Sequence, residues 1–315
     1  MLEDMISRRS FVRNVALAGG AFAAGIGKTQ ARRQRGGDRL HLACNQYPWT
    51  TFYGRENRDF NADLDKGLGE VAASRMDGYE PLANSPREVE TLGPLLKKHG
   101  LEMRSLYVNS ILHERDKAEA SIEAVLAIAR RAKEIGTEII VTNPSPIRWG
   151  GPQNKDDAQL RVQAASLEKL GRRLREMGLI LSYHNHDIEL RNAAREFHHM
   201  MVGTDPGLVT LCLDAHWIYR GAGNSQVALF DVMKLYGQRI TELHLRQSRD
   251  GVWTETFGDG DIDYEAVAKH LLEINVRPHL VLEQAVETGS PKTMPPVEAF
   301  QKSSQYAREI FAAFA

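Results

Sequence analysis

The sequence predicts a single (β/α)8 TIM barrel of the α/β class, preceded by an N-terminal targeting segment. From residue 40 onward, eight short apolar segments rich in β-branched residues alternate with longer amphipathic segments, which is the pattern of a closed parallel barrel. The composition, 42% hydrophobic and 26% charged, is that of an ordinary globular protein. A doubly wound open sheet is the alternative, but Asn45-Gln46-Tyr47 follows the first strand in place of a Gly-x-Gly phosphate turn.

The first residues have the pattern of an export signal. Arg8 and Arg9 are followed by Phe11 and Arg13, and residues 15–27 form an uncharged run too short for a spanning helix of about 20 residues. This resembles a twin-arginine signal, and residues 29–31 offer a small-residue cleavage site. The alternative is an ordinary basic N-terminal helix.

The signal interpretation sets the domain boundaries and the location. We expect a signal peptide over residues 1–31, a short linker over 32–39 and the barrel over 40–315. The twin-arginine export machinery is then a partner. The protein is expected to be exported to the periplasm, or to stay anchored in the membrane if the segment is retained.

The strands are predicted where β-rich apolar runs end in polar residues. In chain order they are residues 40–46, 78–83, 102–108, 138–142, 179–184, 209–214, 240–245 and 279–283.

The helices are predicted from the i, i+3, i+4, i+7 spacing of apolar residues, clearest at Ile122, Val125, Leu126 and Ala129. Gly100, Gly136 and Gly178 each stand where a helix would end before the next strand. The predicted helices are residues 118–135, 156–177, 224–236, 264–274 and 296–314.

The balance of charges argues against nucleic-acid binding, and the cysteine content argues against a disulfide framework. Lys plus Arg number 40 against 41 Asp plus Glu, so the chain offers no basic field for nucleic acid. Its two cysteines, Cys44 and Cys212, lie in apolar runs, where small buried side chains are expected in place of a disulfide framework.

Metal-ligating residue types stand at the ends of the last four strands, where a TIM barrel places its active site. Strand alternation puts His184 and His186 on one side of their strand. We expect Asp214, His244 and Glu283 to hold one divalent metal, with His184 or His186 as the fourth ligand. Mn, Co, Zn, Fe and Mg are all candidates. Asp214 has an alternative role as a helix N-cap.

Aromatic and polar residues beyond the strands suggest a carbohydrate pocket, because indole rings pack on the C–H faces of sugars. The alternative is that the tryptophans cap the barrel core. The predicted substrate-binding residues are Trp49, Asn109, His113, Trp149, Trp217, Arg246 and Trp253.

Residues 40–315, with these strand ends, resemble the xylose isomerase-like barrel superfamily, also called sugar phosphate isomerases/epimerases. In that family Glu, Asp, His and Glu at the ends of strands five to eight bind one divalent metal, and the two glutamates move protons. Asp214, His244 and Glu283 match the last three positions, whereas His184 stands where the first glutamate is expected. After His244 this chain has Arg246-Gln247, where the subgroup of the family that it resembles usually has Lys-Asp.

The resemblance implies an isomerase or epimerase that moves a proton next to the carbonyl of a keto-sugar. Glu283 is then a ligand that also moves protons, and His186 or Glu189 is the second acid/base. Because His184 replaces a glutamate, a 3-keto-glycoside lyase or hydrolase, working with a sugar-oxidising dehydrogenase, is the alternative. An endonuclease is disfavoured by the single metal set, and a non-enzymatic periplasmic sugar-binding barrel is the third hypothesis.

Overall fold

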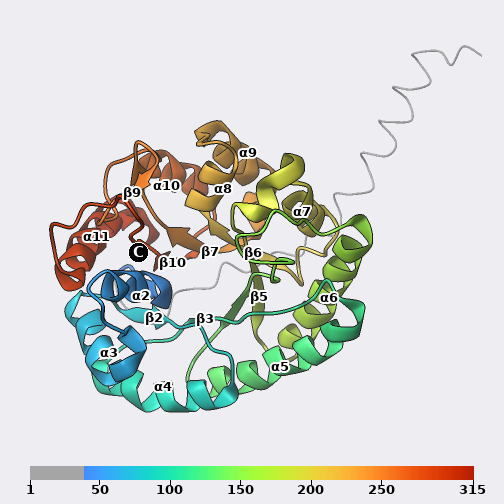
Figure 1. Ribbon diagram of the computed structural model, residues 1–315, viewed down its shortest axis with the longest axis horizontal. Helices are drawn as coiled ribbons and strands as arrows, with labels where there is room; N and C mark the ends of the chain where they lie inside the picture. Colours follow the sequence, from blue (N-terminus) through green and yellow to red (C-terminus); the bar gives the residue numbers. More distant parts are fainter. Residues whose placement is uncertain (1–38) are drawn as a thin grey trace, which may run out of the picture. The chain divides into compact units, whose positions relative to one another are not determined.

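Eight parallel strands form a barrel wall in the structure, a computed structural model that describes residues 39–315 (Figure 1). The strand order is β2-β1-β10-β7-β6-β5-β4-β3, and backbone bonds from Tyr79 N to Glu102 O (2.9 Å) and from Tyr107 N to Pro81 O (3.0 Å) join the two ends. The TIM barrel prediction is therefore confirmed. The strands are β1 Leu42–Asn45, β2 Gly78–Glu80, β3 Ser105–Tyr107, β4 Ile139–Thr142, β5 Ile180–His184, β6 Thr210–Asp214, β7 Ile240–Leu245 and β10 His279–Leu282.

Helices surround this barrel, and a short hairpin of β8 (Ser248–Arg249) and β9 (Val252–Trp253) follows β7 (Figure 1). No helix among residues 39–315 is long and apolar enough to cross a membrane. The helices are α2 Gln46–Gly54, α3 Leu64–Ala73, α4 Pro86–His99, α5 Arg115–Glu134, α6 Asp157–Glu176, α7 Arg191–Val202, α8 Ala215–Gly221, α9 Gln226–Tyr236, α10 Tyr264–Glu273 and α11 Pro296–Ile310.

Local signals in the sequence begin and end the helices. The Ser85 side chain caps α4, and Asp156 with Gln159 forms a capping box at the start of α6. Gly100 after α4 has φ +68°, a left-handed conformation that glycine adopts without strain. The predicted end of a helix at Gly100 is therefore confirmed.

Two strands pass directly into helices, which fixes their last residues at the carboxyl rim of the barrel. Asn45 Oδ1 accepts a hydrogen bond from Tyr47 N (2.7 Å) at the start of α2. Asp214 Oδ1 accepts one from Trp217 N (2.8 Å) at the start of α8.

Trp49 lies in the core, and its predicted place at the barrel mouth is wrong. Its ring stacks on Phe300 of α11 with centroids 4.8 Å apart, and its Nε1 donates to Cys44 Sγ (3.2 Å). Trp49 is fully buried because the chain turns into α2 immediately after β1. The turn directs this indole between the barrel and its helices.

The amino-terminal face of the barrel carries a pair of histidines, of which His41 is buried and His279 half-buried. The rings of His41 and His279 lie 5.3 Å apart. Neither nitrogen of His41 has a hydrogen-bond partner, and the Glu102 carboxylate lies 3.5 Å from its Nε2. Burial lowers the pKa of His41 to about 4 and that of His279 well below its usual value. The charged groups near His41 are Arg104, Glu102, Asp77 and Arg308.

Because His41 is buried in its neutral form, we expect the stability of the fold to decrease at acidic pH. In the unfolded chain His41 takes up its proton near pH 6.5, but in the folded protein only near pH 4. Stability should therefore be fully present above pH 6.5 and fall as the pH decreases toward 4, by up to about 1.4 kcal/mol per pH unit for this residue. Urea unfolding at several pH values should show a shallower pH dependence for His41→Gln. An equal dependence in both proteins would exclude His41 as the cause.

Candidate functional site

Four of the predicted ligand residues meet at the carboxyl ends of neighbouring strands. One ligand atom from each of His184, Asp214, His244 and Glu283 lies within 4.8 Å of the other three, and all four residues are buried. The register explains the meeting, because Asp214 of β6 and His244 of β7 are direct partners across the sheet. His244 Nδ1 lies 2.9 Å from Glu283 Oε2. We call these four residues the ligand cluster.

The ligand cluster fits a divalent metal. His184 Nε2 and Asp214 Oδ2 are buried without a hydrogen-bond partner, a cost that a bound cation would remove. Nitrogen and oxygen atoms that bind the same ion lie about 3–3.5 Å apart. The distance of 2.9 Å between His244 Nδ1 and Glu283 Oε2 is close to this range. Asp214 caps α8 through Oδ1, while its Oδ2 makes no hydrogen bond and is available to a metal. Its two expected roles, helix cap and metal ligand, are therefore compatible.

A buried arginine balances the carboxylates of the cluster. Arg246 Nη2 lies 2.9 Å from Glu283 Oε2 and 3.7 Å from Asp214 Oδ2. Burial opposes ionisation of Glu283, but the charges of Arg246 and His244 outweigh it and hold its pKa well below the usual range. Burial raises the pKa of Asp214 to about 7. Glu283 is therefore the carboxylate that stays ionised.

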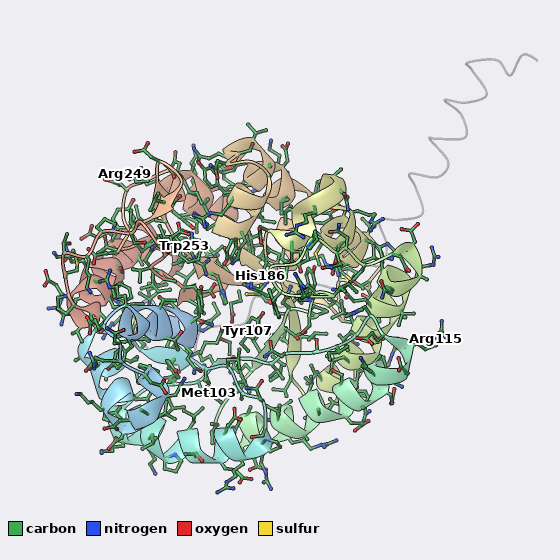
Figure 2. The ribbon with its side chains drawn as sticks, in the orientation of Figure 1. Met103, Tyr107, Arg115, His186, Arg249 and Trp253 are labelled. Carbon is green, nitrogen blue, oxygen red and sulfur yellow. The ribbon has the colours of Figure 1, made fainter. Side chains whose placement is uncertain are left out.

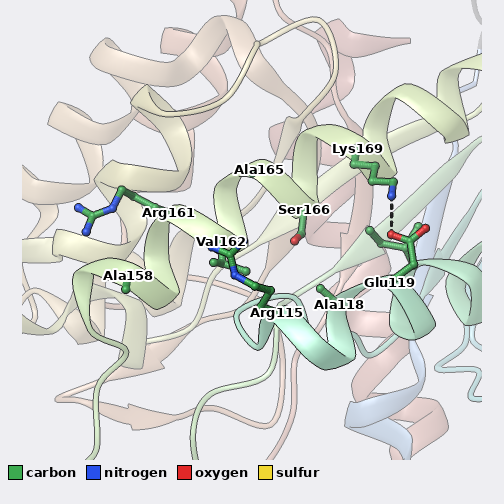
Figure 3. A pocket seen from close by; sticks show the side chains of 10 residues that line it. Arg115, Ala118, Glu119, Ala158, Arg161, Val162, Ala165, Ser166 and Lys169 are labelled. Carbon is green, nitrogen blue, oxygen red and sulfur yellow. Dashed lines mark hydrogen bonds and ion pairs between the residues drawn. The ribbon is translucent and has the colours of Figure 1, made fainter.

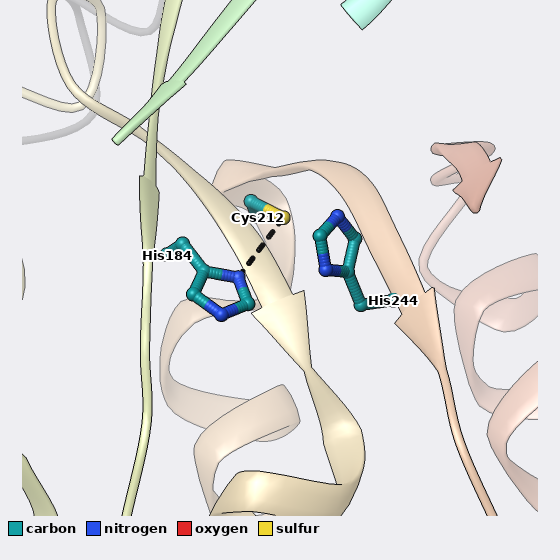
Figure 4. A group of neighbouring side chains, drawn as sticks. All are labelled: His184, Cys212 and His244. Carbon is teal, nitrogen blue, oxygen red and sulfur yellow. Dashed lines mark hydrogen bonds between the residues drawn. The ribbon is translucent and has the colours of Figure 1, made fainter. Parts of the chain in front are cut away.

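Burial also determines the state of the first histidine. It lowers the pKa of His184 well below its usual value, with His186 and His244 adding to the effect. His184 is thus a neutral imidazole, the form that binds metals. Its Nδ1 lies 3.6 Å from Cys212 Sγ, which leaves Nε2 for the cluster (Figure 4).

Two further carboxylates, which sequence reasoning missed, hold the ring of His244 from inside the barrel. His244 Nε2 lies 3.0 Å from Glu242 Oε1 and 3.3 Å from Glu80 Oε2. Glu80 accepts hydrogen bonds from Asn45 Nδ2 (2.5 Å) and Ser105 Oγ (2.8 Å). Carboxylates behind a ligating imidazole fix its tautomer and orientation, so Glu242 and Glu80 are positioning residues.

The predicted second acid/base residues occupy different places. His186 is half-buried, and its ring centroid lies 4.7 Å from that of His184; Figure 2 shows it near the centre of the barrel. Glu189 is buried behind it, and its Oε2 accepts a hydrogen bond from the backbone N–H of His186 (2.7 Å). Burial raises the pKa of Glu189 to about 7, and Glu196 adds to the effect. Of the two, His186 has surface open to a substrate.

Two of the predicted tryptophans surround Arg246. Its Cζ atom lies 4.9 Å from the ring centroid of Trp217 and 4.4 Å from that of Trp253, within range of a cation–π interaction. Trp149 is exposed and lies edge-to-face against His186 at 5.1 Å. These three indoles therefore lie around the cluster.

The remaining predicted sugar ligands contact neighbouring loops. Asn109 is exposed and donates to Asn84 Oδ1 (3.3 Å), and His113 is buried with its Nε2 3.7 Å from Glu114. Their role in binding a sugar stays a prediction.

A separate groove lies on the outside of the barrel, between α5 and α6 (Figure 3). It has a volume of about 630 Å³, and a salt bridge between Lys169 and Glu119 lies along it. Ala118, Ala158 and Ala165 contribute to its wall. The groove lies on helix surfaces, apart from the strand ends that carry the ligand cluster.

Comparison with known proteins finds a family, a curated relative and solved structures that this chain resembles. A model of the xylose isomerase-like TIM barrel family matches residues 69–310. An inosose dehydratase of Clostridium perfringens is 26% identical over 285 residues, which cover 81% of this chain and 91% of the relative.

Solved structures show the same fold at low identity. A sugar phosphate isomerase/epimerase from Parabacteroides distasonis has a TM-score of 0.67 at 18% identity and covers 92% of this chain and 99% of its own. A 3-keto-D-glucoside 4-epimerase from E. coli has a TM-score of 0.63 at 14% identity and covers 86% of this chain and 100% of its own.

Proposed function

The chain belongs to the xylose isomerase-like TIM barrel family and is an enzyme, and we propose that it moves a proton on the carbon next to the carbonyl of a keto-sugar. In this proposal His184, Asp214, His244 and Glu283 hold one divalent metal. The observation that carries the proposal is the buried cluster itself, in which two ligand atoms, His184 Nε2 and Asp214 Oδ2, have no hydrogen-bond partner among residues 39–315.

Each residue has a distinct part in the reaction. A bound metal would stabilise the negative charge that develops on the substrate oxygens when the proton leaves. Glu283 is ionised, so it can accept the carbon-bound proton without first losing one of its own. His186, at the open side of the cluster, can act on the other face of the sugar. Arg246 keeps Glu283 ionised and is itself held by Trp217 and Trp253.

Two outcomes can follow from this first step. Return of the proton to the other face of the carbon gives an epimer, the reaction named for the E. coli structure. Loss of a group from the next carbon gives elimination, and the relative from C. perfringens is named a dehydratase.

Cleavage of a 3-keto-glycoside is the elimination that we keep as the second candidate. The C2–H and C1–O bonds break, a C1=C2 double bond forms, and the departing oxygen takes a proton. His184 in place of the family's first glutamate favours this outcome, because it removes one of the two anionic bases of a symmetrical epimerase. Burial keeps His184 neutral, so Glu283 is the group that would return its proton to the departing oxygen.

Metal removal tests the proposal. Protein stripped with a chelator should lose turnover of 3-keto-glucosides and free ketoses, and Mn²⁺, Co²⁺, Mg²⁺ or Zn²⁺ should restore it. Product analysis by NMR then separates an epimer from a released aglycone. Full activity after chelation would contradict the proposal, and stoichiometric metal without turnover of any keto-sugar would favour a sugar-binding barrel.

We also propose that the chain is exported by the twin-arginine route and works beside a sugar-oxidising dehydrogenase that supplies the ketone. The signal and the linker fall on residues 1–38, which lie outside the described residues, apart from Arg39 at the end of the linker. Replacing both Arg8 and Arg9 with lysine should retain the protein in the cytoplasm, because the segment between 15 and 27 is weakly apolar and rich in glycine. Cell fractionation checks this, and unchanged export would refute it.

A further inference from the structure

The barrel mouth has two chemically different halves. The ligand cluster and Arg246 come from β5 to β10, whereas the segments after β1 to β4 expose large apolar side chains. We call this second set the apolar rim. Its members are Tyr47 (45% exposed), Leu82 (37%), Ile111 (37%), Ile147 (41%) and Trp149 (55%).

Hydrogen bonds join the four segments of the apolar rim in order. They run from Leu82 N to Gln46 Oε1 (2.9 Å), from Asn109 Nδ2 to Asn84 Oδ1 (3.3 Å) and from Ser145 N to Ser110 O (2.8 Å). The four segments that carry the rim are therefore neighbours around the barrel mouth.

Both ends of the rim contact the candidate active site. The Tyr47 ring centroid lies 5.9 Å from Arg246 Cζ at one end, and the Trp149 ring lies 5.1 Å from His186 at the other. A ligand held at the cluster would thus have this rim directly beside it.

The exposed indole is held by its loop. Arg191 Nη1 donates to Gly151 O (2.8 Å), and the buried Lys155 Nζ lies 2.6 Å from Glu196 Oε1. These contacts fix the segment that carries Trp149 against α7. An exposed indole on an anchored segment offers its face to a planar apolar group.

We propose that the apolar rim binds the aglycone of the substrate, and that this aglycone is an apolar, aromatic group. The inference rests on the proposed function, since it takes the sugar to be held at the cluster. A free ketose carries hydroxyl groups around its whole skeleton and would leave the five apolar side chains in water. An aromatic aglycone would pack on the rim side chains that lie beside the cluster, and exposed apolar side chains next to a polar site are typical of a ligand-binding surface.

A pair of substrates with alcohols of similar acidity tests this. The kcat/KM for 2-phenylethyl 3-keto-glucoside should exceed that for methyl 3-keto-glucoside at least about tenfold, which corresponds to about 1.4 kcal/mol. Trp149→Ala should reduce this selectivity ratio about tenfold. Val227→Ala, at an exposed apolar position on α9, is the matched control and should leave the ratio unchanged.

Binding of the unoxidised glucosides gives a readout without turnover. The 2-phenylethyl glucoside should bind at least about tenfold more tightly than the methyl glucoside, with a loss of that difference in Trp149→Ala. Equal affinities, or equal kcat/KM values with active enzyme, would overturn the inference and leave the proposed function intact. Tighter binding of the 2-phenylethyl glucoside without metal-dependent turnover would refute the proposed function but support the apolar rim as the site that binds the aromatic group.

A second copy of the chain is the competing occupant of the rim. Analytical ultracentrifugation of the wild type and of Ile147→Glu shows whether a second copy of the chain, and not an aglycone, occupies the rim. A dimer that Ile147→Glu dissociates, combined with no preference for the 2-phenylethyl glucoside, would overturn the inference.

Discussion

Glu283→Gln should lower kcat for keto-sugar turnover at least about 10³-fold, the upper part of the range for loss of a general acid–base group. Glutamine keeps the size of the side chain but removes the anion that we propose as proton acceptor and metal ligand. Because Arg246 and His244 hold the pKa of Glu283 well below its usual range, the wild-type group is ionised throughout the neutral range. Steady-state kinetics with metal in excess measure the effect.

The control for this variant is Glu298→Gln, a half-exposed glutamate on α11 that pairs with Lys302. It should retain wild-type kcat. A Glu283→Gln enzyme within tenfold of the wild type would show that another group removes the proton.

Asp214→Asn should weaken metal binding by more than about 100-fold, beyond the loss that outer-shell changes cause. Asparagine keeps an oxygen that can accept the hydrogen bond from Trp217 N, so the cap of α8 survives while the charge on the metal side is lost. Asp214→Ala would remove the cap as well, at a cost of about 1 kcal/mol. Isothermal titration calorimetry gives the affinity.

Thermal unfolding of the metal-free proteins is the control for folding. Asp214→Asn should melt near the wild type, because only the ligand charge has changed. Stoichiometric metal in Asp214→Asn at wild-type affinity would exclude Asp214 from the ligand set.

Strand positions were readable from the sequence, because each strand is a short apolar run that ends in polar residues. β7 has the predicted limits, Ile240–Leu245. The other seven barrel strands are shorter than the predicted segments by one to four residues. Helices α5, α6, α9, α10 and α11 followed from apolar spacing. By contrast, α2 is rich in aromatic residues and threonine and contains Pro48, a composition that hides a helix.

The ligand cluster could be predicted in part. Strand alternation placed His184 and His186 on one side but could not tell which one reaches the cluster; the structure brings His184 to it. Glu242 was readable in principle, because it lies two residues before His244 on the same strand. Glu80 was not, since its contact with His244 depends on barrel closure.

Most of the apolar rim depended on the fold. The sequence pointed to Trp149, which follows a predicted strand, but Ile111 and Ile147 are single apolar residues in loops and carry no signal of their own. Tyr47 lies in α2, a helix that the sequence did not reveal. Trp49 shows the reverse error, because an indole two residues after Tyr47 belongs to the core. Only the direction of the chain after each strand separates such cases.

We propose that the metal-loaded ligand cluster removes a proton from the carbon next to a ketone. With methyl 3-keto-glucoside in deuterated water, NMR detects that step as deuterium at C2 or C4 when a proton returns to the carbon, and as released methanol when cleavage follows. We expect exchange, or release of methanol with it, that requires the metal and is lost in Glu283→Gln. Unreacted substrate without deuterium in the presence of metal-loaded wild-type enzyme, or equal exchange by the variant, would contradict the account.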